Sequence, residues 1–296
     1  LRRDAFSGLE ELILKHYRRA VPPEPAPDQS GPVHHAGSGS PAVRFTVYAE
    51  TAEQLQAVAG YVKDSGPAPA RIYMGTGILN DAVPDRQDRL NDILQVFRQN
   101  DTEIFAALPY VLRSREYPQL DGLLRSALAA DVDGLLIRNC GEYQLLYERG
   151  FDKKMILDHN LYIFNRYACD FWMSLGINEF TAPLEPSEDE TGFPEHCCLE
   201  TEVYGAEPVM VSAQCLFKTA DRCRRDHPSS FLTDRKGKHF PVRAHCDFCY
   251  NVIYNSQPRH IGLKECRRLP AQLLRIRFST ETADQTKDIL GQYLTD

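Results

Sequence analysis

Short β-rich runs alternate with longer helical stretches along most of this sequence of 296 residues. The short runs are rich in branched and aromatic residues, whereas the longer stretches carry apolar residues every three or four positions. Eight such β units, separated mostly by helices over about 250 residues, match the size and order of a (β/α)8 barrel. We therefore predict an α/β protein with a TIM-like (β/α)8 barrel. The predicted strands lie at residues 44–50, 71–77, 102–109, 133–139, 154–161, 178–184, 207–213 and 272–278.

A doubly wound open sheet is the alternative fold for alternating strands and helices. Such a sheet would have fewer strands and commonly a glycine-rich turn after the first one. The segment "MGTGILN" at residues 74–80 has two glycines after a predicted strand but lacks the third glycine at the required offset. The sequence therefore favours the barrel and predicts no dinucleotide site.

The first 42 residues differ in composition from the rest of the chain. Apolar residues at helical spacing between residues 4 and 17 predict an amphipathic helix. Six prolines, with several glycines and serines, follow in residues 21–41 and favour a disordered linker. Because the sequence begins with Leu1 and enters the helix at once, we expect the helix to be the tail of an upstream domain. We divide the sequence into this tail at 1–19, the linker at 20–42, and a barrel domain at 43–296 with a metal-cluster loop at 200–260.

The overall charge limits the partners that this chain can bind. A formal net charge of -7 argues against a general electrostatic grip on nucleic acid, so any RNA contact would have to be local. No apolar run approaches the roughly 18 residues of a membrane span, and no leader with a cleavage site opens the sequence. We expect a cytoplasmic protein without a membrane partner.

Four of the nine cysteines fall in one polar, turn-rich stretch of the sequence. Cys215, Cys223, Cys246 and Cys249 follow the seventh predicted strand with the spacing C-x7-C-x22-C-x2-C. Four thiolates suit either a zinc ion or an iron–sulfur cluster, and the spacing does not separate the two. A redox disulfide between Cys246 and Cys249 is the weaker alternative, because that motif belongs to a small βαβ domain. The adjacent pair at 197 and 198 has no assigned role.

Basic residues crowd around these four cysteines and would offset the negative charge of a thiolate-bound cluster. Taken one at a time, most of them are better explained as ordinary solvated charges. The aromatic and apolar residues that follow Cys246 are expected to shield a bound cluster from water. The basic residues are Arg222, Arg224, Arg225, Arg235, Lys236, Lys238 and Arg243.

Asp158, His159 and Asn165 are the candidate catalytic residues. Asp158 and His159 end a predicted strand, which is where barrel enzymes place their chemistry, so a general-base role is one hypothesis. The alternative is that Asp158 and Asn165 hold the loop backbone by hydrogen bonds. The sequence contains no Gly-x-Ser-x-Gly and no His-Glu-x-x-His motif of known protease types.

Three arginines are the predicted substrate-binding residues. Arg275 and Arg277 alternate on the last predicted strand and therefore point to the same face. If that face is the barrel interior, the two form an anion clamp; otherwise they are outer-face charges. Arg243, beside the cysteines, is the third. An RNA phosphate or a small acidic co-substrate would fit such a site.

Several segments resemble peptidase family U32, the collagenase-like proteases, and the likeness covers most of residues 1–296. It is strongest to long bacterial members that carry extra domains. Two departures stand out: Tyr162 replaces an asparagine, and "CLFKTADRC" lacks a glycine. The matching segments, in chain order, are "LDHNLYIFN", "ETEVYG", "EPVMVSAQC", "FLTDRKGKHFPVRAHCDFCYNVIYNS" and "LLRIRFSTET".

The resemblance implies a barrel-like fold and a [4Fe-4S] cluster held by Cys215, Cys223, Cys246 and Cys249. It also implies oxygen-independent hydroxylation of RNA bases or of a small molecule, within a longer U32 protein. One alternative is a collagenase-like peptidase that cleaves peptide bonds. A second alternative is an accessory domain whose four cysteines hold a structural zinc.

Overall fold

A computed structural model describes residues 2–17, 44–80, 84–185, 197–225, 229–269 and 271–294. The chain divides into two units, residues 1–34 and residues 35–296. In the first unit, helix α1 (Arg2–Tyr17) occupies the stretch where the sequence predicts a helix. The linker predicted at 20–42 lies wholly outside the described residues.

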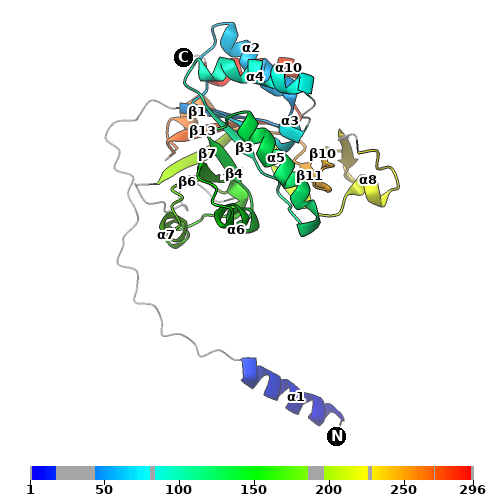
Figure 1. The fold of residues 1–296 in the computed structure, drawn as a ribbon. Coiled ribbons are helices and arrows are strands. Elements are labelled where there is room, and N and C mark those ends of the chain that lie inside the picture. The colour runs from blue at the N-terminus through cyan, green and yellow to red at the C-terminus, as the bar shows by residue number, and fades with distance from the viewer. Residues whose placement is uncertain are drawn as a thin grey trace. The chain divides into compact units, whose positions relative to one another are not determined.

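Eight parallel strands of the second unit close into a barrel, as the sequence predicts (Figure 1). The order around the barrel follows the chain from the first strand to the sixth, and the sixth pairs with the seventh to close the ring. The last strand, β13, lies between β7 and β1. The barrel strands are β1 (Arg44–Ala49), β2 (Arg71–Met74), β3 (Glu103–Ala107), β4 (Gly134–Ile137), β5 (Lys154–Leu157), β6 (Glu179–Thr181), β7 (Cys198–Gly205) and β13 (Leu273–Phe278).

Helices surround this barrel and bury its outer apolar side chains. Figure 1 shows α2, α4 and α10 together along one side and α6 and α7 along another. Thr51 caps α2 through a capping box with Gln54, which satisfies two otherwise unpaired amides of the first turn. The helices are α2 (Ala52–Lys63), α3 (Thr76–Asn80), α4 (Pro84–Arg98), α5 (Tyr117–Ala129), α6 (Cys140–Glu148), α7 (Arg166–Ser174), α9 (Leu263–Cys266) and α10 (Ala283–Leu294), with single turns η1 (Ser114–Glu116) and η2 (His159–Leu161).

The seventh strand is not where the sequence predicts it, and that prediction is wrong. Residues 198–205 form β7, whereas most of 207–213 is β8 (Pro208–Ser212), an edge strand of a separate sheet. Glu200 and Glu202 obscure the apolar pattern of β7, yet both are buried because they pair with arginines inside the barrel. The excursion with the four cysteines still follows the seventh strand, but it begins after Gly205.

This excursion folds into a four-stranded antiparallel sheet, called here the small sheet. Its strands run in the order β8-β11-β10-β9, so β8 and β9 are its two edges. A two-residue strand, β12 (Arg259–His260), then pairs with the end of β7 and returns the chain to the barrel. The remaining elements are β9 (Ser229–Thr233), β10 (His239–His245), β11 (Tyr250–Tyr254) and a single helical turn, α8 (Leu216–Thr219).

Two apolar clusters separate the inside of the barrel from its outside. The larger one fills the space between strands and helices, with Val47 and Ile72 from strands and Leu55 and Val58 from α2. The smaller one comes from alternate strand positions and fills part of the lumen. Within the described residues, no helix is both long and apolar enough to cross a membrane. The lumen cluster is Tyr48, Tyr73, Phe105, Ala107, Leu136 and Ile156.

Candidate functional site at the carboxyl end of the barrel

Asp158 lies at the centre of a buried ion-pair network where β5 ends. Its carboxylate accepts hydrogen bonds from Arg138 Nε at 2.8 Å and Arg275 Nη1 at 2.7 Å, and its side chain is fully buried. Burial by itself would raise the pKa of Asp158, but His159 and the two arginines hold that pKa well below its ordinary value. The carboxylate is therefore ionised at any physiological pH, and its lone pairs are engaged by the protein itself.

Arg275 and Arg277 both point into the barrel and are almost wholly buried. Arg275 binds Asp158, Glu200 and, at 2.8 Å, the hydroxyl of Thr181. Arg277 Nε donates to Glu202 at 2.6 Å. Their alternation thus places them on the lumen side, but each guanidinium already faces a carboxylate of the barrel. A bound anion would have to share or displace these partners.

His159 lies between Arg277 and Asp158 at the mouth of the barrel. Its Nδ1 is 3.0 Å from Arg277 Nη2 and 3.1 Å from Asp158 Oδ1. Burial lowers the pKa of His159, and the charge of Arg277 adds to this effect, so the ring is neutral. Nδ1 thus faces both a donor, Arg277, and an acceptor, Asp158: a proton on Nδ1 would be donated to Asp158, whereas a proton on Nε2 would leave Nδ1 to accept from Arg277. The two tautomers give Nε2 opposite roles toward a substrate, an acceptor in the first and a donor in the second.

Tyr110 connects the same arginine to the third strand. Its hydroxyl accepts from Arg277 Nη1 at 2.8 Å, and its ring lies 4.1 Å from the guanidinium carbon of Arg138. Tyr110 follows β3, so loops from opposite sides of the barrel meet here. Sequence reasoning missed Tyr110, Arg138 and Glu202, because nothing local marks them; only their cross-barrel partners reveal them.

Asn165 takes a different position from the other two catalytic candidates. Its side-chain carbonyl accepts the backbone N–H of Ala168 at 3.0 Å and caps α7, and the residue is exposed. This contact is a hydrogen bond to the backbone, which is the alternative role that the sequence suggests for Asn165. Arg243 lies on β10, where its Nη2 donates to the carbonyl of Ser279 at 2.8 Å. Arg243 therefore contacts the loop that follows β13, the strand that carries Arg277.

The small sheet rests on the carboxyl end of the barrel. Arg113, after β3, donates to the carbonyl of Phe248 at 3.0 Å and to that of Ala213 at 2.6 Å. The hydroxyl of Tyr250 accepts the backbone N–H of Tyr110 at 3.3 Å. The turn that contains the Cys-x-x-Cys therefore lies over the loops that carry barrel chemistry.

His245 contacts the ends of the first two strands. Its Nδ1 lies 3.4 Å from Thr76 Oγ1 and 3.8 Å from Glu50 Oε1, and its ring stacks on Tyr250 at 4.5 Å. A nucleophile–base–carboxylate relay needs the hydroxyl and the carboxylate on different ring nitrogens. Here both approach the same nitrogen, so this trio is not arranged as a hydrolase triad.

Strand register brings three of the four predicted ligand cysteines to one end of the small sheet. Ser212, the last residue of β8, pairs with Asn251 near the start of β11. Cys215 therefore lies at the same end of the sheet as the β10–β11 turn. Asn251 Oδ1 accepts the backbone N–H of Leu216 at 2.7 Å and fixes this placement. Cys246 and Cys249 lie in the turn itself, joined by a 3.3 Å backbone hydrogen bond.

The fourth predicted ligand, Cys223, is exposed in the loop after α8. All nine cysteines are free thiols. Across the described ranges, no three His, Cys, Asp or Glu side chains stand close enough together to hold a metal. The four thiols have the chemistry that a four-thiolate site requires. Binding a cluster would require them to draw together.

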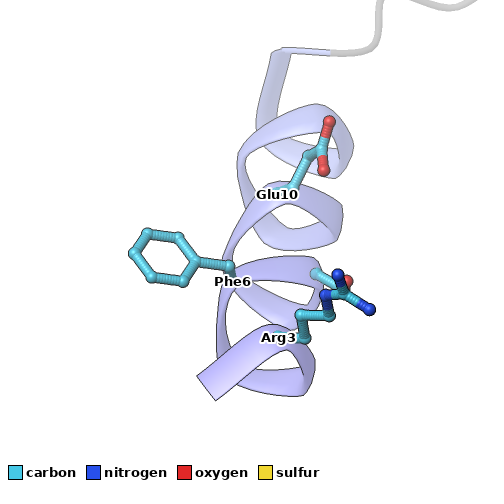
Figure 2. A pocket seen from close by; sticks show the side chains of 4 residues that line it. Arg3, Phe6 and Glu10 are labelled. Carbon is cyan, nitrogen blue, oxygen red and sulfur yellow. The ribbon is translucent and has the colours of Figure 1, made fainter.

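A shallow depression on α1 has none of these properties. Figure 2 shows Arg3, Phe6 and Glu10 on the surface of this one helix, and Ser7 is the fourth lining residue. Side chains from a single exposed helix do not enclose a ligand, so we assign no site there.

Fold and site together define the class of this protein: a (β/α)8 barrel whose carboxyl end bears a buried charge network and a cysteine-rich sheet. The model of Peptidase family U32 matches residues 50–261, which is most of the chain. The chain belongs to this family.

Two solved structures are similar to this chain at low sequence identity. The U32 peptidase Mk0906 is 14% identical with a TM-score of 0.47, covering 89% of this chain and 100% of that chain. Thiamine phosphate pyrophosphorylase from Pyrococcus furiosus is 9% identical with a TM-score of 0.39, covering 86% and 97% respectively. A search of curated proteins gives no match.

Proposed function

We propose that this chain is the cluster-binding barrel of an oxygen-independent hydroxylase that acts on RNA bases or on a related small molecule. Cys215, Cys223, Cys246 and Cys249 would hold a [4Fe-4S] cluster, which supplies electron transfer when bound. One observation carries the proposal: the register of β8 and β11 brings Cys215 beside the Cys246–Cys249 turn, over the carboxyl end of the barrel. We place such a protein in the cytoplasm, where thiols stay reduced.

The surroundings of the cysteine turn support this proposal. Phe248, Tyr250 and Val252 are fully buried beside it, and they would keep water away from a cluster. Below the turn, the ring of His159 would form a hydrogen bond with a polar atom of the substrate. Arg277 and Tyr110 hold that ring in place. Arg243, Arg275 and Arg277 remain the residues that we propose to act on a substrate anion.

Metal analysis tests the cofactor directly. Anaerobically purified protein should contain about four iron atoms per chain and show a broad visible absorbance that bleaches on reduction. Cys215→Ser and Cys246→Ser should lose most of the iron. Cys140→Ser is the matched control, because Cys140 is exposed on α6 and far from the quartet in sequence. A colourless protein with one zinc per chain would refute the cluster and leave the accessory zinc domain.

Product analysis tests the reaction. RNA incubated with cluster-loaded protein and an electron acceptor should gain the mass of one oxygen atom on a base, with water supplying the oxygen and the acceptor taking two electrons. The Cys246→Ser variant should give no such product. Clean protein incubated with denatured collagen, beside a Cys215→Ala control, tests the peptidase alternative. Cleavage by the unmodified protein alone would favour that alternative over hydroxylation.

A further inference from the structure

A hairpin of the small sheet extends beyond the part that the barrel covers. This arm, residues 229–241, consists of β9, a turn and the first residues of β10. Every residue from 229 to 239 is exposed, and Phe240 and Pro241 are half-buried. A two-stranded ribbon with both faces in solvent buries too little to be explained by the core of this protein. Its side chains are available to a partner.

The tip of the arm is a rigid, basic turn. Asp234 Oδ1 accepts the backbone N–H groups of Lys236 and Lys238, both at 2.8 Å, and Gly237 takes the left-handed conformation that closes the turn. Because the only carboxylate of the tip is occupied by these amides, it does not pair with the basic side chains. Within the described residues, neither lysine nor Arg235 forms an ion pair.

An aromatic side chain lies on one face of the arm, directly behind this turn. Phe231 is more than half exposed and packs edge-to-face on His239, with 4.5 Å between ring centroids. The register pairs Phe231 with Pro241 and His239 with Thr233, so all four share one face. A 3.1 Å contact between Thr233 Oγ1 and His239 Nδ1 holds the imidazole. Phe231 is thus a preformed stacking surface.

Charge identifies the kind of partner. Residues 215–245 contain eight lysines and arginines against three aspartates, although the whole chain has a net charge of -7. A positive ribbon on a negative protein attracts polyanions locally and repels them elsewhere. An exposed aromatic ring beside clustered basic groups is the combination that binds single-stranded nucleic acid, by base stacking and phosphate contact. The deep groove of an RNA duplex would not admit this ribbon.

An anionic membrane fits the arm less well. The apolar side chains Phe231 and Leu232 are neighbours in one strand and therefore project from opposite faces. A ribbon lying on a bilayer could bury only one of them. The tip, which would enter first if the arm inserted end-on, carries Arg235, Lys236 and Lys238.

We propose that the arm binds a single-stranded segment of RNA, with Arg235, Lys236 and Lys238 on phosphates and Phe231 stacked on a base. The inference rests on the proposed function, because it names the element that holds the RNA. Strand β10 leaves the arm at Pro241 and ends directly before Cys246, and the span from Pro241 to Cys246 is about 17 Å at the usual rise per residue. An RNA segment bound on the arm therefore lies within a few nucleotides of the cysteine turn.

Fluorescence anisotropy of a labelled, unstructured RNA with the full chain tests this inference. The triple variant Arg235→Glu, Lys236→Glu, Lys238→Glu should weaken binding at least about tenfold and reduce the slope of log affinity against log salt by about 2. Phe231→Ser should weaken binding about fivefold or more with the salt slope unchanged. The control triple, Lys63→Glu, Arg125→Glu, Lys287→Glu, reverses the same residue types at exposed positions of α2, α5 and α10.

The outcomes separate the arm from its alternatives. Equal weakening by both triples would reduce the effect to net charge and overturn the inference, as would unchanged binding in the arm triple. Binding of phosphatidylserine vesicles in place of RNA would also overturn it. Iron content, measured on every variant, keeps the two proposals distinct: RNA binding through the arm without iron supports the arm and refutes the hydroxylase. A full cluster without RNA binding overturns the arm alone.

Discussion

The role that the sequence suggests for Asp158 differs from the role that the structure supports. Its place at a strand end suggested a general base, yet Arg138 and Arg275 enclose its carboxylate within hydrogen-bond distance. Protonating this carboxylate would leave the buried Arg138 without its carboxylate partner and would take one of two carboxylates from Arg275. At this position the geometry favours an anchor for the barrel interior, which in turn positions His159.

Asp158→Asn should therefore destabilise the fold strongly. Removing the charge leaves Arg138 without its carboxylate partner and Arg275 with Glu200 alone, at a cost of about 3–5 kcal/mol. Asp121→Asn is the matched control, since Asp121 pairs with Arg149 at the surface, where such pairs contribute about 0–1 kcal/mol. Urea denaturation of both variants measures the difference. Similar small losses in both would show that Asp158 is not such an anchor.

Glu142 gives a pH-dependent prediction at the same scale. Burial raises the pKa of Glu142 to about 8, although it accepts the backbone N–H groups of Arg138 and Asn139. The folded state then keeps a proton that the unfolded chain releases above pH 4.5, so stability falls as pH rises from about 5 to about 8. The slope from this group is at most about 1.4 kcal/mol per pH unit.

Glu142→Gln should remove that slope, because an amide keeps the acceptor oxygen and does not titrate. Urea unfolding at several pH values between about 5 and 8.5 measures it. Glu148→Gln, at an exposed position of the same helix, should leave the slope as it is in the unmodified chain. An unchanged slope in Glu142→Gln would contradict the assignment.

At the scale of elements, tight packing inside the barrel explains the glycine that opens β4. A Cβ at Gly134 would lie 2.2 Å from the carbonyl oxygen of Lys154 and 2.5 Å from the ring of Phe105. Neither the backbone of β5 nor a buried aromatic ring can move freely. Periodicity assigned the strand correctly, but it carried no information about this close approach.

Gly134→Ala should destabilise the protein by about 1–3 kcal/mol or more through overpacking. Gly291→Ala is the control: nothing lies within 4 Å of its added Cβ, and α10 should gain from alanine there. Thermal unfolding followed by circular dichroism compares the two. A neutral Gly134→Ala would mean that the neighbouring strands accommodate the methyl group.

The link between β11 and the Cys215 segment yields a second prediction for an element. Asn251→Ala removes the acceptor for the amide of Leu216, a bond whose net value is about 1 kcal/mol. If the cluster forms as proposed, a chelator should remove its iron about fivefold faster from this variant. Asn255→Ala, which changes an asparagine just beyond the opposite end of β11, should behave like the unmodified chain. Equal rates of iron loss from the two variants and the unmodified chain would show that the Asn251–Leu216 hydrogen bond does not help to retain the cluster.

At the scale of the whole molecule, the barrel closes without any residue of the first unit. All eight strands and the helices around them lie within residues 44–294. The unit of residues 35–296 therefore has a complete core and should fold by itself.

Deletion of residues 1–34 should shift the Tm of the barrel by less than about 2 °C. Circular dichroism melts of the full and shortened chains, at equal concentration, make the comparison. A fall of more than about 4 °C, on the order of 1 kcal/mol for a domain of this size, would show that α1 stabilises the barrel.

The sequence by itself determined the barrel, seven of its eight strands and the presence of four cysteines in one excursion. Local periodicity carries this information, because side-chain spacing fixes which face of an element is buried. It failed at β7, where Glu200 and Glu202 look like surface residues and Val209 and Met210 look like core. In the structure the glutamates are buried and the apolar pair is exposed.

Only the tertiary structure decided the roles of the charged residues. Asp158 and Arg275 are 117 positions apart, and Arg277 and Glu202 are 75 apart, so no local pattern links them. The same holds for Cys215, which reaches the Cys246–Cys249 turn through strand register and not through spacing. A buried charge is stable only beside its partner, and the closed barrel alone brings such distant partners within 3 Å.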